Sequence, residues 1–219
     1  MNPEEILQEV ASQIMVCERC NLCKTRKNAV PGSGPADAEI LFIGEGPGHH
    51  ENERGLPFVG NAGQFLNAML QAAGYERKSV FITNVVKCRP PANRDPLPEE
   101  LAACGGYLDR QIAAINPTII VTLGRFSMAR YFSNVRISDV HGRPKWVDGR
   151  LIIPMFHPAA ALHQPALRKT VEQDFARLPH WIAKVKEKLA NEAAVPSAPI
   201  EVKKDESPDE AEPTQLSLF

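Results

Sequence analysis

The chain has 219 residues, of which 43% are hydrophobic and 23% are charged. These values are typical of a soluble domain, and they exclude collagen-like, wholly disordered and coiled-coil proteins. No apolar run approaches the roughly 18 residues of a membrane span, and the acidic N-terminus lacks the basic start and apolar stretch of a signal peptide. We therefore expect a cytoplasmic protein of one domain with an appendage.

Charge is divided unevenly along the chain, although the formal net charge is only −1. Residues 190–219 contain seven acidic and two basic residues, which leaves residues 1–189 with a net charge of +4. A basic body is compatible with a nucleic-acid partner and equally with an ordinary solvated surface. Charge alone does not choose between these two interpretations.

Apolar periodicity predicts a helix over residues 2–16. Its start is also indicated, because Asn2 can cap it and Pro3 suits its first position. Four nearly continuous β-branched runs then predict strands that are buried on both faces: Glu39–Gly44, Val80–Val85, Thr118–Leu123 and Leu151–Phe156. Further helical patterns span Asn61–Ala73, Pro98–Ile115, Arg125–Phe132 and Pro165–Leu189, the last with a break expected at Pro179. Alternating strands and helices predict a parallel sheet in a three-layer α/β fold over residues 1–189.

The sequence changes character after the last helical pattern. Residues 190–214 contain few large apolar residues and many Pro, Glu, Asp and Ala, so they cannot bury enough surface to offset the entropy of ordering. We predict a disordered acidic linker there. The chain ends in the apolar pentapeptide 215–219, QLSLF.

The predicted strands end in unusual residues. The first runs into Gly44–Gly48 (GEGPG), the second ends at Asn84, the third at Gly124 and the fourth at His157. In open α/β sheets ligands bind beyond these carboxyl ends, so a glycine-rich loop, an amide and an imidazole should share one crevice. The loop matches neither the Walker nor the dinucleotide fingerprint. Such a crevice suits a planar heterocycle, for which Phe58 is either a stacking face or part of the core.

The residues near these strand ends match a known family in order and spacing. Four segments carry the match: Gly44–Gly48, Gly55–Gly63 (GLPFVGNAG), Thr83–Pro91 (TNVVKCRPP) and His157–Ala160 (HPAA). Over about residues 10–185 the chain closely resembles the family 4 uracil-DNA glycosylases, bacterial and archaeal enzymes with an iron–sulfur cluster. The resemblance implies the uracil-DNA glycosylase fold, with a four-stranded parallel sheet between helices, which agrees with the strand count above.

The resemblance also implies a reaction. Deoxyuridine is flipped out of the duplex and its N-glycosidic bond is hydrolysed, which releases uracil and leaves an abasic site. Phe58 would stack on the base, while Asn84 would accept from N3–H and donate to O4, a pattern that cytosine reverses. His157 and the Gly46 N–H would stabilise charge on the departing uracil.

The resemblance leaves open which residue handles the attacking water. The family 1 branch carries Asp where this chain has Gly46, so the obvious general base is missing. Glu45 and Glu51 are the candidates, and Glu51 also fits a guard against the thymine methyl group. We expect both carboxylates in the site.

Five cysteines in a reducing compartment favour metal or cluster ligation over disulfides. Zinc more often uses two tight pairs, whereas the four thiolates of an iron–sulfur cluster tolerate wider spacing. The family implies a 4Fe–4S cluster on Cys17, Cys20, Cys88 and Cys104, with a structural role near DNA rather than a redox role. Cys23 departs from the family pattern, because Cys20 and Cys23 form a competing pair of the same spacing.

The segment after His157 is expected to contact DNA. In the wider superfamily the corresponding loop enters the minor groove, which would make Leu162 or His163 the wedge and Arg168 and Lys169 phosphate contacts. Simple packing and a helix start explain the same residues nearly as well. Relatives that trap DNA covalently carry an Arg-rich insertion after the glycine loop, which this chain lacks, so we expect turnover.

The C-terminal residues resemble the short peptide by which bacterial replication and repair proteins bind the sliding clamp. Gln215 would sit in a polar pocket, while Leu216, Leu218 and Phe219 would fill an apolar cleft. A linker of about 25 residues would span roughly 25–30 Å and would raise the effective concentration of the protein at DNA. We expect a nucleoid-associated monomer.

Two other functions stay open. A non-enzymatic DNA-binding accessory protein on the same scaffold would hold zinc on its cysteines and merely grip a base. The joint presence of Glu45, Phe58, Asn84 and His157 disfavours that function. A glycosylase of broader range would also act on hypoxanthine or xanthine, and Asn84 favours uracil without excluding them.

Overall fold

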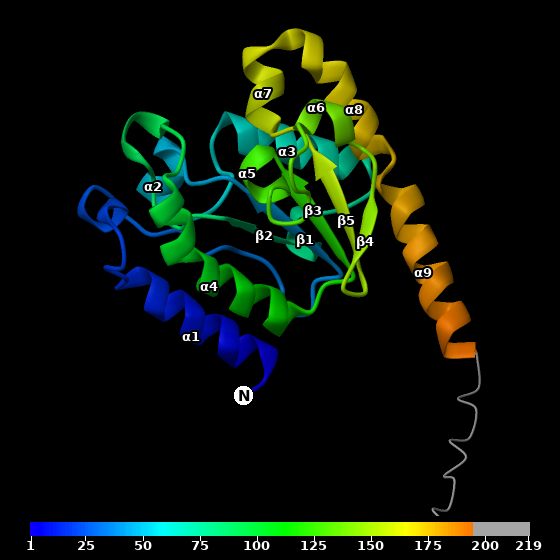
Figure 1. The fold of residues 1–219 in the computed structure, drawn as a ribbon, viewed down its shortest axis with the longest axis horizontal. Coiled ribbons are helices and arrows are strands. Elements are labelled where there is room, and N and C mark those ends of the chain that lie inside the picture. Colours follow the sequence, from blue (N-terminus) through cyan, green and yellow to red (C-terminus); the bar gives the residue numbers. More distant parts are fainter. Residues whose placement is uncertain (195–219) are drawn as a thin grey trace, which may run out of the picture.

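The computed structural model describes residues 1–194, and residues 195–219 lie outside the described part. A sheet in the order β2-β1-β3-β5-β4 forms the centre of the described residues (Figure 1). Its first four members run parallel and the last pairs antiparallel with its neighbour. The strand bounds in chain order are β1 (Ile40–Gly44), β2 (Phe81–Asn84), β3 (Ile119–Leu123), β4 (Lys145–Val147) and β5 (Arg150–Met155).

The four parallel strands are those that the apolar runs predict, each with slightly different ends. Gly44 pairs with Asn84 across β1 and β2, and Leu123 pairs with Met155 across β3 and β5. The carboxyl ends of these strands therefore meet at one edge of the sheet, which confirms the arrangement predicted from their sequence.

The expected four-stranded sheet is in fact five-stranded. β4 was missed because its three residues are not an apolar run, and none of them is fully buried. It forms a hairpin with β5 through Asp148 and Gly149, whose φ values of 48° and 76° are typical of the tight turns that join antiparallel strands.

Helices connect the strands and close the chain. Their bounds are α1 (Pro3–Met15), α2 (His49–Arg54), α3 (Asn61–Ala72), α4 (Pro98–Ile115), α5 (Arg125–Met128), α6 (Ile137–Val140), α7 (Pro158–His163), α8 (Arg168–Ala176) and α9 (Leu178–Ala194). Single 3₁₀ turns span Asn21–Lys24, Arg77–Ser79, Pro91–Asn93 and Pro165–Leu167. The expected cap of α1 is present, since Asn2 Oδ1 accepts the Glu5 N–H at 2.9 Å.

Three helix predictions need correction. α5 ends at Met128 rather than at Phe132, and the chain turns soon afterwards at Asn134, whose φ is 58°. The break near the C-terminus falls at Arg177 between α8 and α9. Pro179 lies inside the first turn of α9, where a missing N–H costs nothing. α9 also runs on to Ala194, five residues into the segment expected to be linker.

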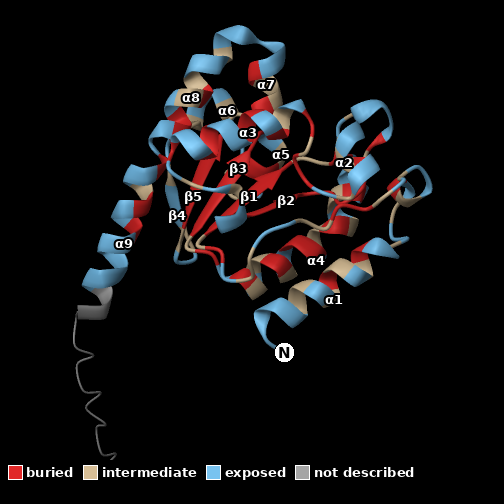
Figure 2. Cartoon of the chain, turned by 180° about the vertical axis from the view of Figure 1, so that it is seen from behind, coloured by how far each residue is buried: buried red, intermediate tan, exposed pale blue. Residues whose placement is uncertain are grey.

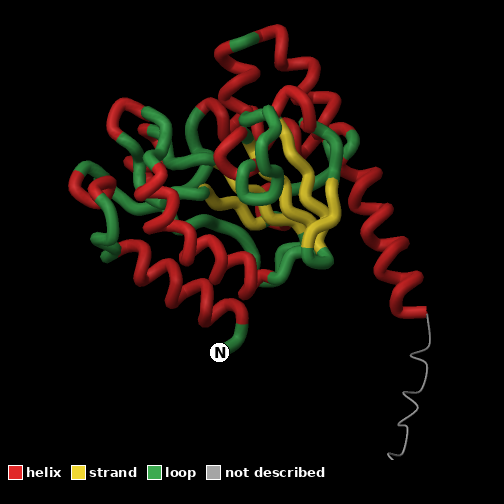
Figure 3. Tube along the Cα trace, in the orientation of Figure 1, coloured by secondary structure: helices red, strands yellow, loops and turns green. Residues whose placement is uncertain are grey.

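Two helical layers cover the sheet, and the sheet itself is almost wholly buried (Figure 2). On one face, α3, α7, α8 and α9 pack against alternate strand residues such as Phe42 and Ile153. On the other face, α4 contributes Leu108 and Ile115, which pack against Leu41 and its neighbours. The three-layer α/β fold is thereby confirmed, with strands in the middle and helices outside (Figure 3).

α1 lies alongside α4 at the outside of the second layer (Figure 1). Val10 and Ile14 of α1 are buried against Tyr107 of α4 in a third apolar cluster. Within residues 1–194 no helix is long and apolar enough to cross a membrane. The rest of the predicted linker and the pentapeptide 215–219 lie outside the described residues.

Candidate active site

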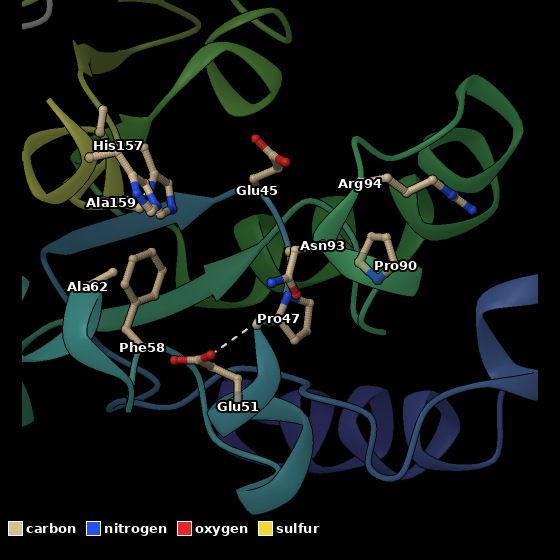
Figure 4. Close-up of a pocket in the computed structure, with 14 residues that line it drawn as sticks. Glu45, Pro47, Glu51, Phe58, Ala62, Pro90, Asn93, Arg94, His157 and Ala159 are labelled. Atoms are coloured by element: carbon tan, nitrogen blue, oxygen red, sulfur yellow. Dashed lines mark hydrogen bonds between the residues drawn. The ribbon is translucent and has the colours of Figure 1, made fainter.

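A cavity of about 390 Å³ opens at the carboxyl edge of the sheet. Its walls come from the glycine loop after β1, the segment before α3, the loop after β2 and the start of α7. Figure 4 shows the side chains of Glu45, Glu51, Phe58 and His157 around this space. Residues from three separate parts of the chain, 45–62, 90–94 and 157–163, thus meet where the strand ends predict a crevice.

Glu51, on α2, ties two walls of the cavity together. Its Oε2 accepts the N–H of Gly48 at 3.1 Å, and its Oε1 accepts the N–H groups of Val59 and Gly60 at 2.8 and 2.9 Å. These bonds join the glycine loop to the segment that carries Phe58. Both carboxylate oxygens of Glu51 are therefore engaged by backbone donors.

Phe58 is held in a conformation that its residue type rarely adopts. Its φ of 51° lies in the left-handed region, which costs about 1–3 kcal/mol and persists only where the surroundings impose it. Arg77 supplies one restraint, since its guanidinium donates to the carbonyls of Pro57 and, at 3.2 Å, Phe58. Gly63 allows this backbone to pack closely, because a Cβ there would lie 1.8 Å from the Phe58 carbonyl oxygen. The Phe58 backbone is thus held by Arg77 and packed against Gly63.

His157 is the N-cap of α7 and is half-buried at the cavity. Its Nδ1 accepts the N–H of Ala159 at 3.1 Å, which places the ring hydrogen of the neutral imidazole on Nε2. Burial lowers the pKa of His157 to about 4, against a smaller opposing effect of the Glu51 carboxylate. The imidazole is therefore a neutral N–H donor at physiological pH.

Asn84 lies next to the ring of Phe58 and is not among the residues that line the cavity. It is only 1% exposed, and its Oδ1 is buried without a hydrogen-bond partner. A Cβ at Gly44 would lie 2.4 Å from this oxygen and 2.7 Å from two ring carbons of Phe58, so only glycine allows amide and ring to meet there. An unpaired buried acceptor costs about 1–3 kcal/mol, and a ligand N–H would relieve that cost.

Glu45 differs from Glu51 in having a free carboxylate. Within residues 1–194 no hydrogen bond or ion pair engages it, although the backbone carbonyl of Glu45 accepts the Val86 N–H at 3.1 Å. Burial raises the pKa of Glu45; Asp95 adds to this effect and Arg125 opposes it. A half-buried carboxylate with a raised pKa is a candidate general base.

Gly46 follows Glu45 and is packed closely from behind. A Cβ there would lie 2.8 Å from Cγ2 of Val86. The aspartate that the family 1 branch carries at this point would therefore require Val86 to move.

The four cysteines implied as cluster ligands come together in the third apolar cluster. Cys88 and Cys104 are buried in it, and Cys17 and Cys20 pack against it, whereas Cys23 is not part of it. All five are free thiols. Within residues 1–194 no three His, Cys, Asp or Glu side chains form a ligand set for a single metal ion.

Arg26 binds this cysteine region from one side. Its Nη1 donates to the Cys17 carbonyl at 2.7 Å and to Cys88 Sγ at 3.3 Å, and its Nη2 donates to the Met15 carbonyl at 2.9 Å. Burial raises the pKa of Cys88 to about 11, an effect that Arg26 reduces. The guanidinium is therefore placed to favour a thiolate at Cys88.

The residues expected to contact DNA lie on α7 and α8, next to the cavity. Leu162 is 43% exposed, and His163 is among the cavity-lining residues. Arg168 is exposed. Its Nε donates to Glu172 Oε1 at 2.9 Å, and its guanidinium lies over the ring of Phe65. Lys169 is exposed.

Comparison with known families identifies the class of protein that this cavity represents. The model of the Uracil DNA glycosylase superfamily matches residues 31–178, a span that contains every residue lining the cavity. The chain belongs to the uracil-DNA glycosylase superfamily. The resemblance found in the sequence motifs is thus confirmed.

Several relatives in the superfamily are type-4 uracil-DNA glycosylases. This chain is 48% identical over 182 residues to that of Sulfurisphaera tokodaii, a match covering 78% of this chain and 83% of the relative. It is 47% identical over 184 residues to that of Archaeoglobus fulgidus, a match covering 80% of this chain and 92% of the relative. It is 43% identical over 186 residues to that of Thermotoga maritima, covering 83% of this chain and 97% of the relative.

Part of the wall of this superfamily site was not predicted. Pro90, Asn93 and Arg94 line the cavity from the loop between Cys88 and Cys104. Arg94 is anchored by a two-pronged ion pair with Glu100 of α4, at 2.9 and 2.7 Å. Pro90 lies within the Thr83–Pro91 motif, and only the position of Asn93 and Arg94 directly after that motif could have indicated that they approach the site.

Proposed function

We propose that this protein is a monofunctional uracil-DNA glycosylase that flips deoxyuridine out of DNA and hydrolyses its N-glycosidic bond. The observation that carries the proposal is the buried, unpartnered Oδ1 of Asn84 beside the ring of Phe58. An aromatic face next to a free acceptor suits a planar base with an N–H on its edge. Superfamily membership supports the same conclusion.

The pocket would select uracil through the edge of the base. Uracil would lie on Phe58, donate its N3–H to Asn84 Oδ1 and accept from the Asn84 amide nitrogen at O4. Cytosine presents an acceptor at N3 and a donor at C4, so it would leave both amide groups unpaired. Because Arg77 holds the backbone of Phe58, the stacking face would be in place before the base arrives.

The departing uracil carries negative charge, which donors at its O2 would stabilise. His157 supplies a neutral Nε2–H, since its Nδ1 is occupied by Ala159. The backbone N–H of Gly46 would supply a second donor on the wall of the same cavity. One preorganised donor of this kind is typically worth about 3–4 kcal/mol.

We assign the attacking water to Glu45 and a positioning role to Glu51. The carboxylate oxygens of Glu51 accept hydrogen bonds from three backbone N–H groups, whereas the Glu45 carboxylate has no partner within residues 1–194. A weak base of this kind suffices where bond cleavage is largely dissociative, because the oxocarbenium-like sugar is already strongly electrophilic.

The adjoining surface would hold the DNA. Leu162 or His163 would enter the minor groove and fill the gap that the flipped nucleotide leaves, and their exposure beside the cavity supports this role. Arg168 and Lys169, at the start of α8, would contact phosphates.

The four clustered cysteines would hold a 4Fe–4S cluster. They fit such a group because all four gather in the third apolar cluster, and four thiolates are the ligand set of such a cluster. When bound, the cluster would serve as a structural cross-link between the N-terminal segment and the loop after β2. Cys17, Cys20, Cys88 and Cys104 would be its ligands, and Cys23 would remain free.

The pentapeptide 215–219 would bind the sliding clamp and tether the enzyme to replicating DNA. Its sequence supports this, with one glutamine followed by two leucines and a terminal phenylalanine. Deleting residues 215–219 should abolish binding to the purified bacterial clamp and leave excision from oligonucleotides unchanged. Equal clamp affinity of both forms would refute the tether.

One assay separates the candidate functions. The purified protein is incubated with duplexes that contain uracil, thymine, hypoxanthine or xanthine at one position, and alkali then cleaves any abasic site. We expect strand scission in the uracil duplex alone. Scission of the hypoxanthine or xanthine duplexes would indicate a broader range, and DNA binding without scission of any duplex would indicate an accessory protein.

A further inference from the structure

Lys87 is a buried lysine whose ammonium group has no role in the mechanism above. It is only 1% exposed, although it lies between the strand end that carries Asn84 and the cysteine region. Its Nζ donates to Thr83 Oγ1 at 2.6 Å, to the Asn84 carbonyl at 2.8 Å and to Gln111 Oε1 at 2.7 Å. Three N–H donors thus meet three uncharged acceptors.

The end of β2 explains why this lysine reaches Asn84 from behind. Successive strand side chains point to opposite faces, so Thr83 faces Gln111 of α4 while Asn84 faces Phe58. Lys87 approaches from the Thr83 side and bonds to the main-chain oxygen of Asn84. The amide that would read the base and the carbonyl that Lys87 holds belong to the same residue.

The group around Lys87 is anchored to a separate part of the chain. Thr83 Oγ1 donates to the Pro31 carbonyl at 2.9 Å, and Gln111 Nε2 donates to the same oxygen at 2.8 Å. The carbonyl of Lys87 itself accepts the Val30 N–H at 2.7 Å. The ammonium therefore belongs to a buried network that cannot shift without breaking several bonds.

We propose that Lys87 is a positioning residue for base recognition, which holds the Asn84 carbonyl and so fixes the backbone from which the Asn84 amide reaches the base. This inference rests on the proposed uracil excision. A small rotation of the Asn84 backbone would displace Oδ1 from the N3–H of the base, and misplacement by about 1 Å can cost about 100-fold in rate. Lys87 would act only through Asn84.

The bond to Asn84 does not depend on the charge of Lys87. Burial lowers the pKa of Lys87 to about 7. A neutral amine keeps two N–H donors, which suffice for the Asn84 carbonyl and Gln111 Oε1. The Asn84 carbonyl retains its donor in either form.

Lys87→Met tests the proposal, with Gln111→Leu as a matched control. Lys87→Met removes the donor to Asn84, whereas Gln111→Leu disrupts the same buried network and leaves that bond in place. The measurements are single-turnover excision of uracil, the Kd for the uracil duplex, iron per chain and the midpoint of thermal unfolding. Should Lys87→Met yield too little folded protein, Lys87→Leu, which also lacks a donor, takes its place in the comparison.

We expect Lys87→Met to slow single-turnover excision by about 10- to 100-fold with unchanged iron content and DNA affinity, because phosphate contacts dominate that affinity. Gln111→Leu should destabilise the fold similarly and excise uracil within about threefold of the wild type. An excision rate of Lys87→Met equal to that of the wild type, or an equal loss in both variants, would overturn the proposal. Failure of the wild type to excise uracil would instead overturn the proposed function.

Discussion

The ring of Phe58 stacks on the imidazole of His157, with 5.5 Å between the ring centroids and 28° between their planes. A base between two rings needs about twice the 3.5 Å contact distance of stacked atoms, so uracil cannot lie between them at this spacing. It must lie against the part of Phe58 that faces the cavity, with the imidazole at its edge. That placement agrees with an imidazole that acts as an N–H donor rather than as a second stacking face.

Changing Asn84 to Asp tests the edge-reading role. A carboxylate loses the N–H donor to O4 and repels the charge that develops on uracil, so uracil excision should fall by about 100-fold or more. Single-turnover rates on a uracil duplex measure the effect, and the midpoint of thermal unfolding serves as the control for folding. Uracil excision at the wild-type rate would rule out this role for Asn84.

The pH dependence of excision should come from Glu45 and not from His157. Burial raises the pKa of Glu45, and its carboxylate is the active form, so the rate falls as pH decreases through that raised pKa. His157, with a pKa of about 4, stays neutral between about pH 5 and 8. The Glu45→Gln variant should be slow and independent of pH over this range. A fall in rate near pH 6.5 that persists in Glu45→Gln would contradict the assignment.

Arg77 is expected to maintain the strained backbone of Phe58. Arg77→Met leaves the carbonyls of Pro57 and Phe58 without this donor, which should lower the free energy of unfolding by about 1–3 kcal/mol. Relaxation of φ at Phe58 should also slow excision by about tenfold. Arg77→Lys, which can still reach one carbonyl, is the control and should retain most of the rate. Loss of stability with an unchanged excision rate would show that Arg77 has no role in positioning the ring.

The choice of cluster ligands is tested by a pair of serine variants. Cys17 packs with Cys88 and Cys104 and Cys23 does not, so Cys17→Ser should lose iron and visible absorbance while Cys23→Ser keeps both. Iron per chain after anaerobic purification is the measurement. The reverse result would move the ligand pair to Cys20 and Cys23, and a colourless wild type with zinc would overturn the cluster itself.

The parallel strands of the fold could be predicted from the sequence because each is a continuous apolar run. The run at Glu39–Gly44 marks β1, whereas β4 has only three partly exposed residues and leaves no such pattern. The motifs also identify the cavity residues, including Phe58 and His157. Two relationships needed coordinates. One is the burial of Asn84 next to the ring of Phe58, and the other is the burial of Lys87, since a lysine in a loop motif gives no sign that it is enclosed.

In the proposed complex the base lies on Phe58 and pairs with Asn84. A crystal structure of Glu45→Gln bound to a duplex with a flipped, non-hydrolysable deoxyuridine analogue tests this arrangement most directly. We expect the uracil ring against Phe58, with N3 within hydrogen-bond distance of Asn84 Oδ1 and O2 facing His157 Nε2. A base seated instead among Pro90, Asn93 and Arg94, with the Asn84 oxygen still unpartnered, would contradict this account.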